Sequence, residues 1–231
     1  MMKKMLMAVI ALMMTMSVSA QFFIYLSDGT IAQVDSISTI GHKYVDLGLS
    51  VKWADCNVGA NSPEEYGDYF AWGEVEPKEV YSWSSYKWCT CNGLATTLTK
   101  YNTNPSYGTV DDKTVLETAD DAAAANWGGA WRIPTKEEQE ELRTKCTWTW
   151  INQNGVNGYK VIGPNGNSIF LPAAGYFSDS TLNYEGSGGY YWTSMLTSET
   201  LDFAYGMYCA SEVDWFGYNR SYGLSIRPVC K

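Results

Sequence analysis

Short runs of alternating apolar and polar residues dominate the second half of the chain. A period of two is typical of β-strands that bury one face. Turn-forming stretches rich in Gly, Asn and Pro, such as 163–167, separate these runs. The pattern predicts strands at 42–47, 51–54, 69–72, 148–151, 159–162, 168–171, 190–194, 203–208 and 224–229.

Two segments between these runs instead predict helices. In 118–127, Thr118 can cap the amino end, Asp120 and Asp121 suit the first turn or its cap, and the alanines that follow are strong helix formers. In 136–145, Thr135 is the expected N-cap, and Glu138 can complete a capping box with it. Two helices among many short, mainly antiparallel strands predict an α+β domain. Residues 73–112 show no clear period and predict a long loop.

The chain between the two helices forms a predicted rigid corner. Pro134 holds the residue before it extended, and Thr135 then starts the second helix. We expect Trp131 to be buried and Arg132 to be paired. Arg227, near the carboxyl end, is expected to have the same structural role, contacting carboxylates or backbone carbonyls behind the sheet.

The amino-terminal residues predict a targeting signal and not a folded element. Lys3 and Lys4 precede an apolar run at 5–16, and small residues precede Gln21, as in a secretory signal peptide at 1–20. Residues 21–40 predict a small β unit, with a hairpin of 22–26 and 30–34 and a possible third strand at 36–40. The main domain then spans 41–231. No second long apolar stretch follows, so the protein is not expected to be membrane-embedded.

The net charge and the cysteine content limit the partners, disulfides and metal sites that the protein is expected to have. The net charge at pH 7 is −9, which argues against nucleic acid as a partner. Export permits disulfides among the six cysteines, and Cys209 with Cys230 is the preferred pair. Cys89 and Cys91 are too close in sequence to favour a disulfide bond with each other. They are also not favoured as metal ligands, because the chain has no second pair of closely spaced cysteines to complete a metal site. No metal or cofactor is predicted.

Several sequence blocks, in order, resemble the Fibrobacter succinogenes major paralogous domain family, which is similar to secreted and surface proteins of Bacteroidetes. The match covers roughly 42–231, and the blocks are 46–49, 52–60, 66–74, 131–135, 170–175, 191–194 and 223–229. The resemblance implies a C-type-lectin-like fold shared with the formylglycine-generating enzyme. A second resemblance links 213–229 to the variable region of C-type-lectin-like proteins that retroelements diversify.

The resemblance does not carry an activity with it. The formylglycine-generating enzyme relies on a nearby pair of cysteines close to its carboxyl end, whereas here Cys209 is followed only by Cys230. The Glu-Pro-Asn, Gln-Pro-Asp and Trp-Asn-Asp motifs of calcium-dependent lectins do not occur. We therefore expect neither oxidase activity nor calcium-dependent sugar binding, and no catalysis.

Aromatic and small polar residues near the carboxyl end form the candidate site. Tyr and Trp give large contact areas at low entropy cost, and Ser and Asn add adaptable hydrogen bonds. The predicted ligand-binding residues are Tyr205, Tyr208, Ser211, Asp214, Trp215, Tyr218, Asn219 and Tyr222. The expected ligand is a glycan or a protein on another cell or host surface. The alternative is that about half of these aromatic residues pack in the core or within strands and do not bind a ligand.

Three alternatives remain open for the whole protein. Asp68 and Glu74 could be the paired acids of a glycan hydrolase. The domain could be a structural component of the surface, without a ligand. The second resemblance implies the third, a receptor that a retroelement diversifies. Location is expected to be periplasmic, secreted or at the outer cell surface.

Overall fold

The structure, a computed structural model, describes residues 22–25, 31–34, 42–90, 97–198 and 200–231. The chain divides into two units, 1–42 and 43–231. In the first unit, β1 (Phe22–Tyr25) and β2 (Ile31–Val34) pair antiparallel, with Phe22 opposite Val34. The predicted leader and the possible third strand at 36–40 lie outside the described residues.

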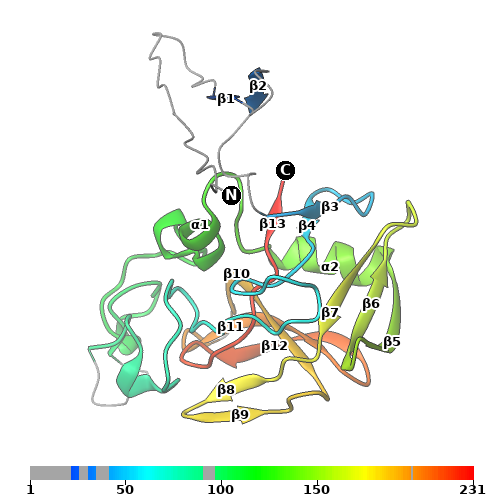
Figure 1. Ribbon diagram of the computed structural model, residues 1–231. Helices are drawn as coiled ribbons and strands as arrows, with labels where there is room; N and C mark the ends of the chain where they lie inside the picture. The colour runs from blue at the N-terminus through cyan, green and yellow to red at the C-terminus, as the bar shows by residue number, and fades with distance from the viewer. Residues whose placement is uncertain (1–21, 26–30, 35–41, 91–96, 199) are drawn as a thin grey trace, which may run out of the picture. The chain divides into compact units, whose positions relative to one another are not determined.

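The second unit combines small antiparallel sheets with two helices, so the α+β class predicted from the sequence is confirmed (Figure 1). Its strands are β3 (Tyr44–Val45), β4 (Lys52–Ala54), β5 (Thr147–Gln153), β6 (Val156–Ile162), β7 (Ser168–Pro172), β8 (Tyr176–Ser178), β9 (Thr181–Asn183), β10 (Gly189–Leu196), β11 (Phe203–Cys209), β12 (Val213–Asn219) and β13 (Val229–Cys230). The sheet orders are β13-β4-β3, β5-β6-β7, β8-β9 and β10-β11-β12. The α-helices are α1 (Ala122–Trp127) and α2 (Lys136–Lys145), with 3-10 turns at Trp83–Ser85, Pro105–Tyr107 and Thr118–Asp120.

A complete capping box starts α2. Thr135 Oγ1 accepts from the Glu138 amide at 3.3 Å, and a Glu138 carboxylate oxygen accepts from the Thr135 amide at 2.9 Å. The same carboxylate accepts from Arg132 Nη1 at 2.7 Å, and Trp131 beside it is buried. The corner is therefore tied to the helix it starts. From there α2 packs against β10 and β11.

Helix α1 starts later than predicted. Of the predicted capping groups, Asp121 rather than Thr118 is the N-cap, and its Oδ1 accepts from the Ala124 amide at 3.0 Å. Residues 118–120 instead form a 3-10 turn. Asp121 Oδ2 also accepts from the Ile133 amide at 2.8 Å, so a contact with the distant corner fixes which residue caps the helix.

Three predicted strands are much shorter than expected. Of 42–47, only Tyr44–Val45 forms a strand. Of 69–72, only Phe70 makes a β-bridge, with Leu224, and of 224–229 only Val229 belongs to a strand. The backbone of 223–225 bridges to three different segments in turn, at Phe177, Phe70 and Tyr191. A chain that changes partner at every residue cannot form a continuous ladder.

The core forms two apolar clusters on either side of β10. Trp192, with Phe70 and Leu224, belongs to one, and Tyr191, with Trp53 of β4 and apolar residues of β6 and β7, belongs to the other. Successive side chains of a strand point to opposite faces, so β10 is buried on both sides. The β10-β11-β12 sheet is thus anchored at β10 and exposed toward β12.

The predicted bond between Cys209 and Cys230 is wrong, because both are free thiols. Cys209 ends β11 in one apolar cluster, whereas Cys230 lies on β13 in the other. Cys56 and Cys146 are also free, and burial raises the pKa of each to about 11. Of the pair Cys89 and Cys91, the second lies outside the described residues.

Candidate functional site

The eight predicted binding residues do not share one surface. In the β11–β12 hairpin, Tyr208 is opposite Asp214, and Ala204 is opposite Tyr218, which places these residues on one face. Tyr205 and Trp215 lie on the other face, as does Asn219 opposite Phe203. The alternation of side chains along a strand therefore divides the predicted site.

The face with Tyr205 and Trp215 packs against α2. Lys136 Nζ lies 3.9 Å from the centroid of the Tyr205 ring, and Arg143 Cζ lies 4.7 Å from that of the Trp215 ring. A hydrogen bond from Ser198 and the charge of Lys136 lower the pKa of Tyr205. Trp215 Nε1 and Asn219 Oδ1 are buried without a hydrogen-bond partner among the described residues. The residues of this face are therefore engaged in packing against α2 and are not assigned to the ligand-binding site.

The opposite face gathers aromatic rings from several elements into one contiguous surface. We call it the tyrosine surface, and it consists of Tyr176, Tyr184, Tyr190, Tyr208, Phe216, Tyr218 and Tyr222. It joins the β8–β9 hairpin to the β10-β11-β12 sheet, which lie next to each other in Figure 1.

Ring contacts fix the arrangement of this surface. Tyr176 lies at its centre, stacked on Tyr222 at 5.4 Å and on Tyr184 at 6.1 Å, with the edge of Tyr190 at 4.8 Å. Offset stacks and edge contacts of this kind each add to the stability of an aromatic cluster. The rings are consequently held in place before any ligand arrives.

Exposure varies across the tyrosine surface. Tyr184 is 61 % exposed and Phe216 45 %, whereas Tyr190 is buried at its base. Gly206 makes room for this packing, because a Cβ there would lie only 2.8 Å from Cδ2 of Tyr218. The most accessible rings therefore stand at opposite ends, one beyond β9 and one on β12.

The hydroxyl groups of this surface have no hydrogen-bond partner among the described residues. Elsewhere in the domain, tyrosine hydroxyls donate to backbone carbonyls. Tyr69 donates to Ala174, Tyr86 to Trp72 and Tyr191 to Pro172. In the tyrosine surface, burial and neighbouring tyrosines raise the pKa of Tyr176, Tyr190 and Tyr218. Neutral hydroxyls are thus left to bond with a ligand or with water.

Sequence reasoning found part of this surface. It named Tyr208, Tyr218 and Tyr222, with Asp214 beside them, and Ser211 lies exposed at the tip of the β11–β12 hairpin. It missed Tyr176, Tyr184, Tyr190 and Phe216. The available signal was the concentration of tyrosines in 176–191, but their proximity to β12 depends on tertiary structure.

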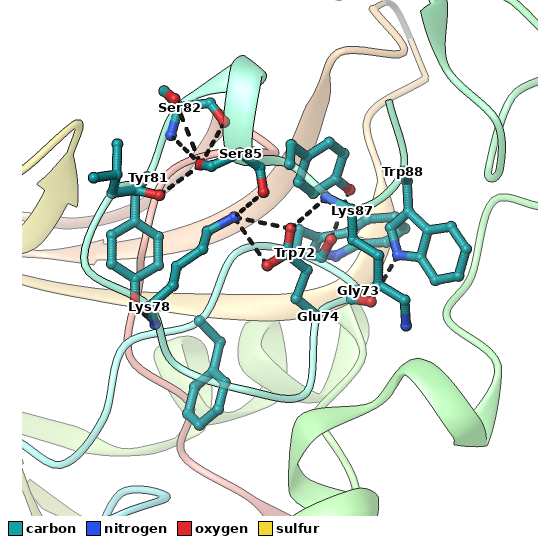
Figure 2. A network of polar contacts seen from close by, with 12 residues as sticks. Trp72, Gly73, Glu74, Lys78, Tyr81, Ser82, Ser85, Lys87 and Trp88 are labelled. Atoms are coloured by element: carbon teal, nitrogen blue, oxygen red, sulfur yellow. Dashed lines mark hydrogen bonds and ion pairs between the residues drawn. The ribbon is translucent and has the colours of Figure 1, made fainter. Parts of the chain in front are cut away.

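The alternative acidic site is occupied by structural contacts. Figure 2 shows Glu74 within a polar network, where its carboxylate accepts from Lys78 Nζ at 2.9 Å and from the Lys87 amide at 2.7 Å. Glu74 is only 8 % exposed. Asp68 instead packs against Gly59, where an added Cβ would lie 2.4 Å from Asp68 Oδ2. No hydrogen bond links Asp68 to Glu74 in the part of the chain that the structure describes.

The described ranges contain no group of three or more His, Cys, Asp or Glu side chains placed to hold a metal ion. They also contain no helix that is long and apolar enough to span a membrane.

Comparison of the chain with protein-family models, curated proteins and solved structures finds no match. The resemblance carried by 42–231 stays a prediction from the sequence. The function must therefore be argued from the geometry of the site.

Proposed function

We propose that this protein is an exported, non-catalytic binding module whose tyrosine surface recognises a glycan or a protein on another cell or host surface. The observation that carries the proposal is the contiguous set of rings with hydroxyls that have no described partner. The export predicted from residues 1–20 would expose this surface to such ligands.

The physical chemistry of the surface suits recognition. Tyrosine offers a large amphipathic contact area with few rotatable bonds, so little entropy is lost on binding. The rings are already fixed by stacking, which lowers the cost further. Asp214 and Ser211 are exposed near this surface and add polar groups beside the rings.

The contacts of Glu74 favour this proposal over a hydrolase. A general acid or base must reach the substrate with a free oxygen. Glu74 is instead buried and paired with Lys78. Its arrangement is that of a residue that organises the loop around it.

We also infer a C-type-lectin-like fold, on the strength of the sequence resemblance. The blocks that carry the resemblance meet one another in space, which supports the inference. Arg132 bridges to Val229, Tyr191 bridges to Ser225, and Arg227 Nη2 donates to the Phe170 carbonyl at 2.9 Å.

A binding screen with matched variants tests the proposal. Wild-type protein is applied to a glycan array and to immobilised cell-surface protein extracts, beside Tyr184→Ala/Phe216→Ala and the control Tyr44→Ala. Tyr44 is an exposed tyrosine at 47 %, on β3 outside the tyrosine surface. We expect the double variant to bind roughly tenfold more weakly or worse, as at interface hot spots, and the control to bind as wild type. Binding that survives the double variant would contradict the proposal.

A further inference from the structure

Strand β5 has an open edge. The sheet order β5-β6-β7 places it at the end of its sheet, so β6 alone pairs with it. In Figure 1 it forms the right-hand margin of the domain. All seven of its residues are paired with β6 in one continuous register, from Thr147 opposite Ile162 to Gln153 opposite Val156.

The hairpin turn determines which backbone groups face outward. Asn154 and Gly155 form the two-residue loop, both with positive φ (52° and 91°), as in a type I′ turn. Such a loop is closed by a hydrogen-bonded pair, here Gln153 and Val156, and bonded pairs then alternate along the ladder. The N–H and C=O groups of Trp148, Trp150 and Asn152 therefore point away from β6. No backbone hydrogen bond from another described segment satisfies them.

This edge lacks the usual protection against pairing. Exposed edge strands are normally blunted by charges, proline, bulges or a covering segment. The residues of β5, Thr-Trp-Thr-Trp-Ile-Asn-Gln, include no charge and no proline, and the register has no bulge. By contrast, the other edge strand of this sheet, β7, contains Pro172, and Arg227 occupies its Phe170 carbonyl.

We propose that β5 pairs with β5 of a second copy of this chain, antiparallel, about a two-fold axis at Trp150. Each outward-facing residue then exchanges both of its backbone hydrogen bonds with the partner. On one face Trp150 meets its own copy and Trp148 meets Asn152, while on the other face Thr149 meets Ile151. The strand is therefore complementary to itself.

The self-complementary strand selects a second copy as the occupant, and its lack of charge permits the contact. The chain carries a net charge of −9, so most other contacts between copies bring like charges together. Strand β5 has no charged residue of its own, and the carboxylate of Glu64 accepts hydrogen bonds from the side chains of Gln153, the last residue of β5, and Asn154 in the turn, away from the axis at Trp150. Trp150, which is 40 % exposed, becomes covered in the pair. A single strand pair is a small interface, so the dimer should be reversible.

The dimer would carry two tyrosine surfaces. Linked sites raise the apparent affinity for a surface that displays many copies of a ligand. The pairing itself does not depend on the proposed function, and it can be measured without a ligand.

Sedimentation velocity over a concentration series tests the pairing. We expect wild-type protein to move from monomer toward dimer as concentration rises, and Trp150→Lys to shift this transition to at least about tenfold higher concentration, because two like charges would meet at the axis. Val110→Lys is the matched control, an exposed valine in a loop outside β5. A wild-type protein that stays monomeric, or a control that weakens the dimer equally, would overturn the proposal.

Amide hydrogen exchange in the wild-type protein gives a readout that needs no variant. The amides of Trp148, Trp150 and Asn152 should become more protected as concentration rises, while exchange at Thr149 and Ile151, already bonded to β6, changes little. Protection of the outward-facing amides that does not depend on concentration would show that the same chain covers the edge. Either that result or a lack of protection at every concentration would overturn pairing between copies.

Discussion

At the scale of single residues, two buried arginines hold the irregular parts of the domain together. Arg220 donates to the carbonyls of Lys100, Tyr101 and Leu201 and to the Tyr86 hydroxyl. Arg227 donates to the carbonyls of Ala54, Asp55 and Phe170 and to Asn57 Oδ1. The guanidinium group, with its five fixed donors, can satisfy several carbonyls from different segments at once. Loops without regular ladders thereby keep their backbone groups paired.

Replacing Arg227 with methionine should strongly destabilise the domain. The variant leaves three carbonyls and an amide oxygen without their donor in a dry interior, and we expect a loss of about 3 kcal/mol or more in the free energy of unfolding. Lys145→Met is the control, because Lys145 is exposed and its pair with Glu141 should contribute less than about 1 kcal/mol. Urea denaturation measures both, and equal losses would contradict the assigned role of Arg227.

At the scale of elements, the sequence predicted best those helices and strands whose ends are set by contacts between residues close in sequence. The bounds of α2 follow from Thr135 and Glu138, which are three residues apart and bond directly. The start of α1 followed only in part: Asp121 was among the predicted capping groups, but its contact with Ile133, which favours it over Thr118, depends on tertiary structure. Likewise, the alternation along β11 and β12 separates Tyr208 from Tyr205, but only the register shows which face meets α2. Residues that act through neighbours in sequence were predictable. Of the residues that act across sheets, Arg227 was correctly expected to contact backbone carbonyls, but the segments that it joins were not predicted.

The capping box at α2 should make stability depend on pH. Although burial alone would raise it, hydrogen bonds from Arg132 and the Thr135 amide hold the pKa of Glu138 below its ordinary value of 4.5. A depressed pKa means that ionised Glu138 stabilises the fold above pH 4.5 and that this contribution is lost as pH falls through the folded-state pKa.

Glu138→Gln tests this dependence. We expect it to lower the free energy of unfolding by about 1–2 kcal/mol at pH 7, through loss of the charged contacts with Arg132 and the amide. The difference from wild type should shrink as the pH falls below 4.5, where the native carboxyl also becomes neutral. Denaturation curves at several pH values measure it, and a difference that stays constant down to pH 2 would argue against the assignment.

At the scale of the whole molecule, the candidate site lies directly on the scaffold. Buried β10 and the corner at Trp131 tie the sheets together. Tyr190 of the tyrosine surface belongs to one of the two apolar clusters, four of its tyrosines pack against that cluster, and Tyr184 and Phe216 are its exposed rings. The clearest sequence signals therefore identify the scaffold. The site is assembled from rings that are distant in sequence, from Tyr176 to Tyr222, so only about half of it could be named before the fold was known.

Chemical footprinting of tyrosines tests the central claim most directly, because it locates the contact in the wild-type sequence, without an amino-acid substitution. Tyrosine rings are iodinated in the free protein and in protein bound to the glycans or cell-surface extracts that retain it. The extent of modification is then read at each residue by mass spectrometry. Tyr184 and Tyr44 are both exposed in the free domain and serve as the probe and its control. The account predicts that bound material protects Tyr184 and leaves Tyr44 as reactive as before. Equal reactivity of Tyr184 in the free and bound states, or protection of Tyr44 in its place, would contradict it.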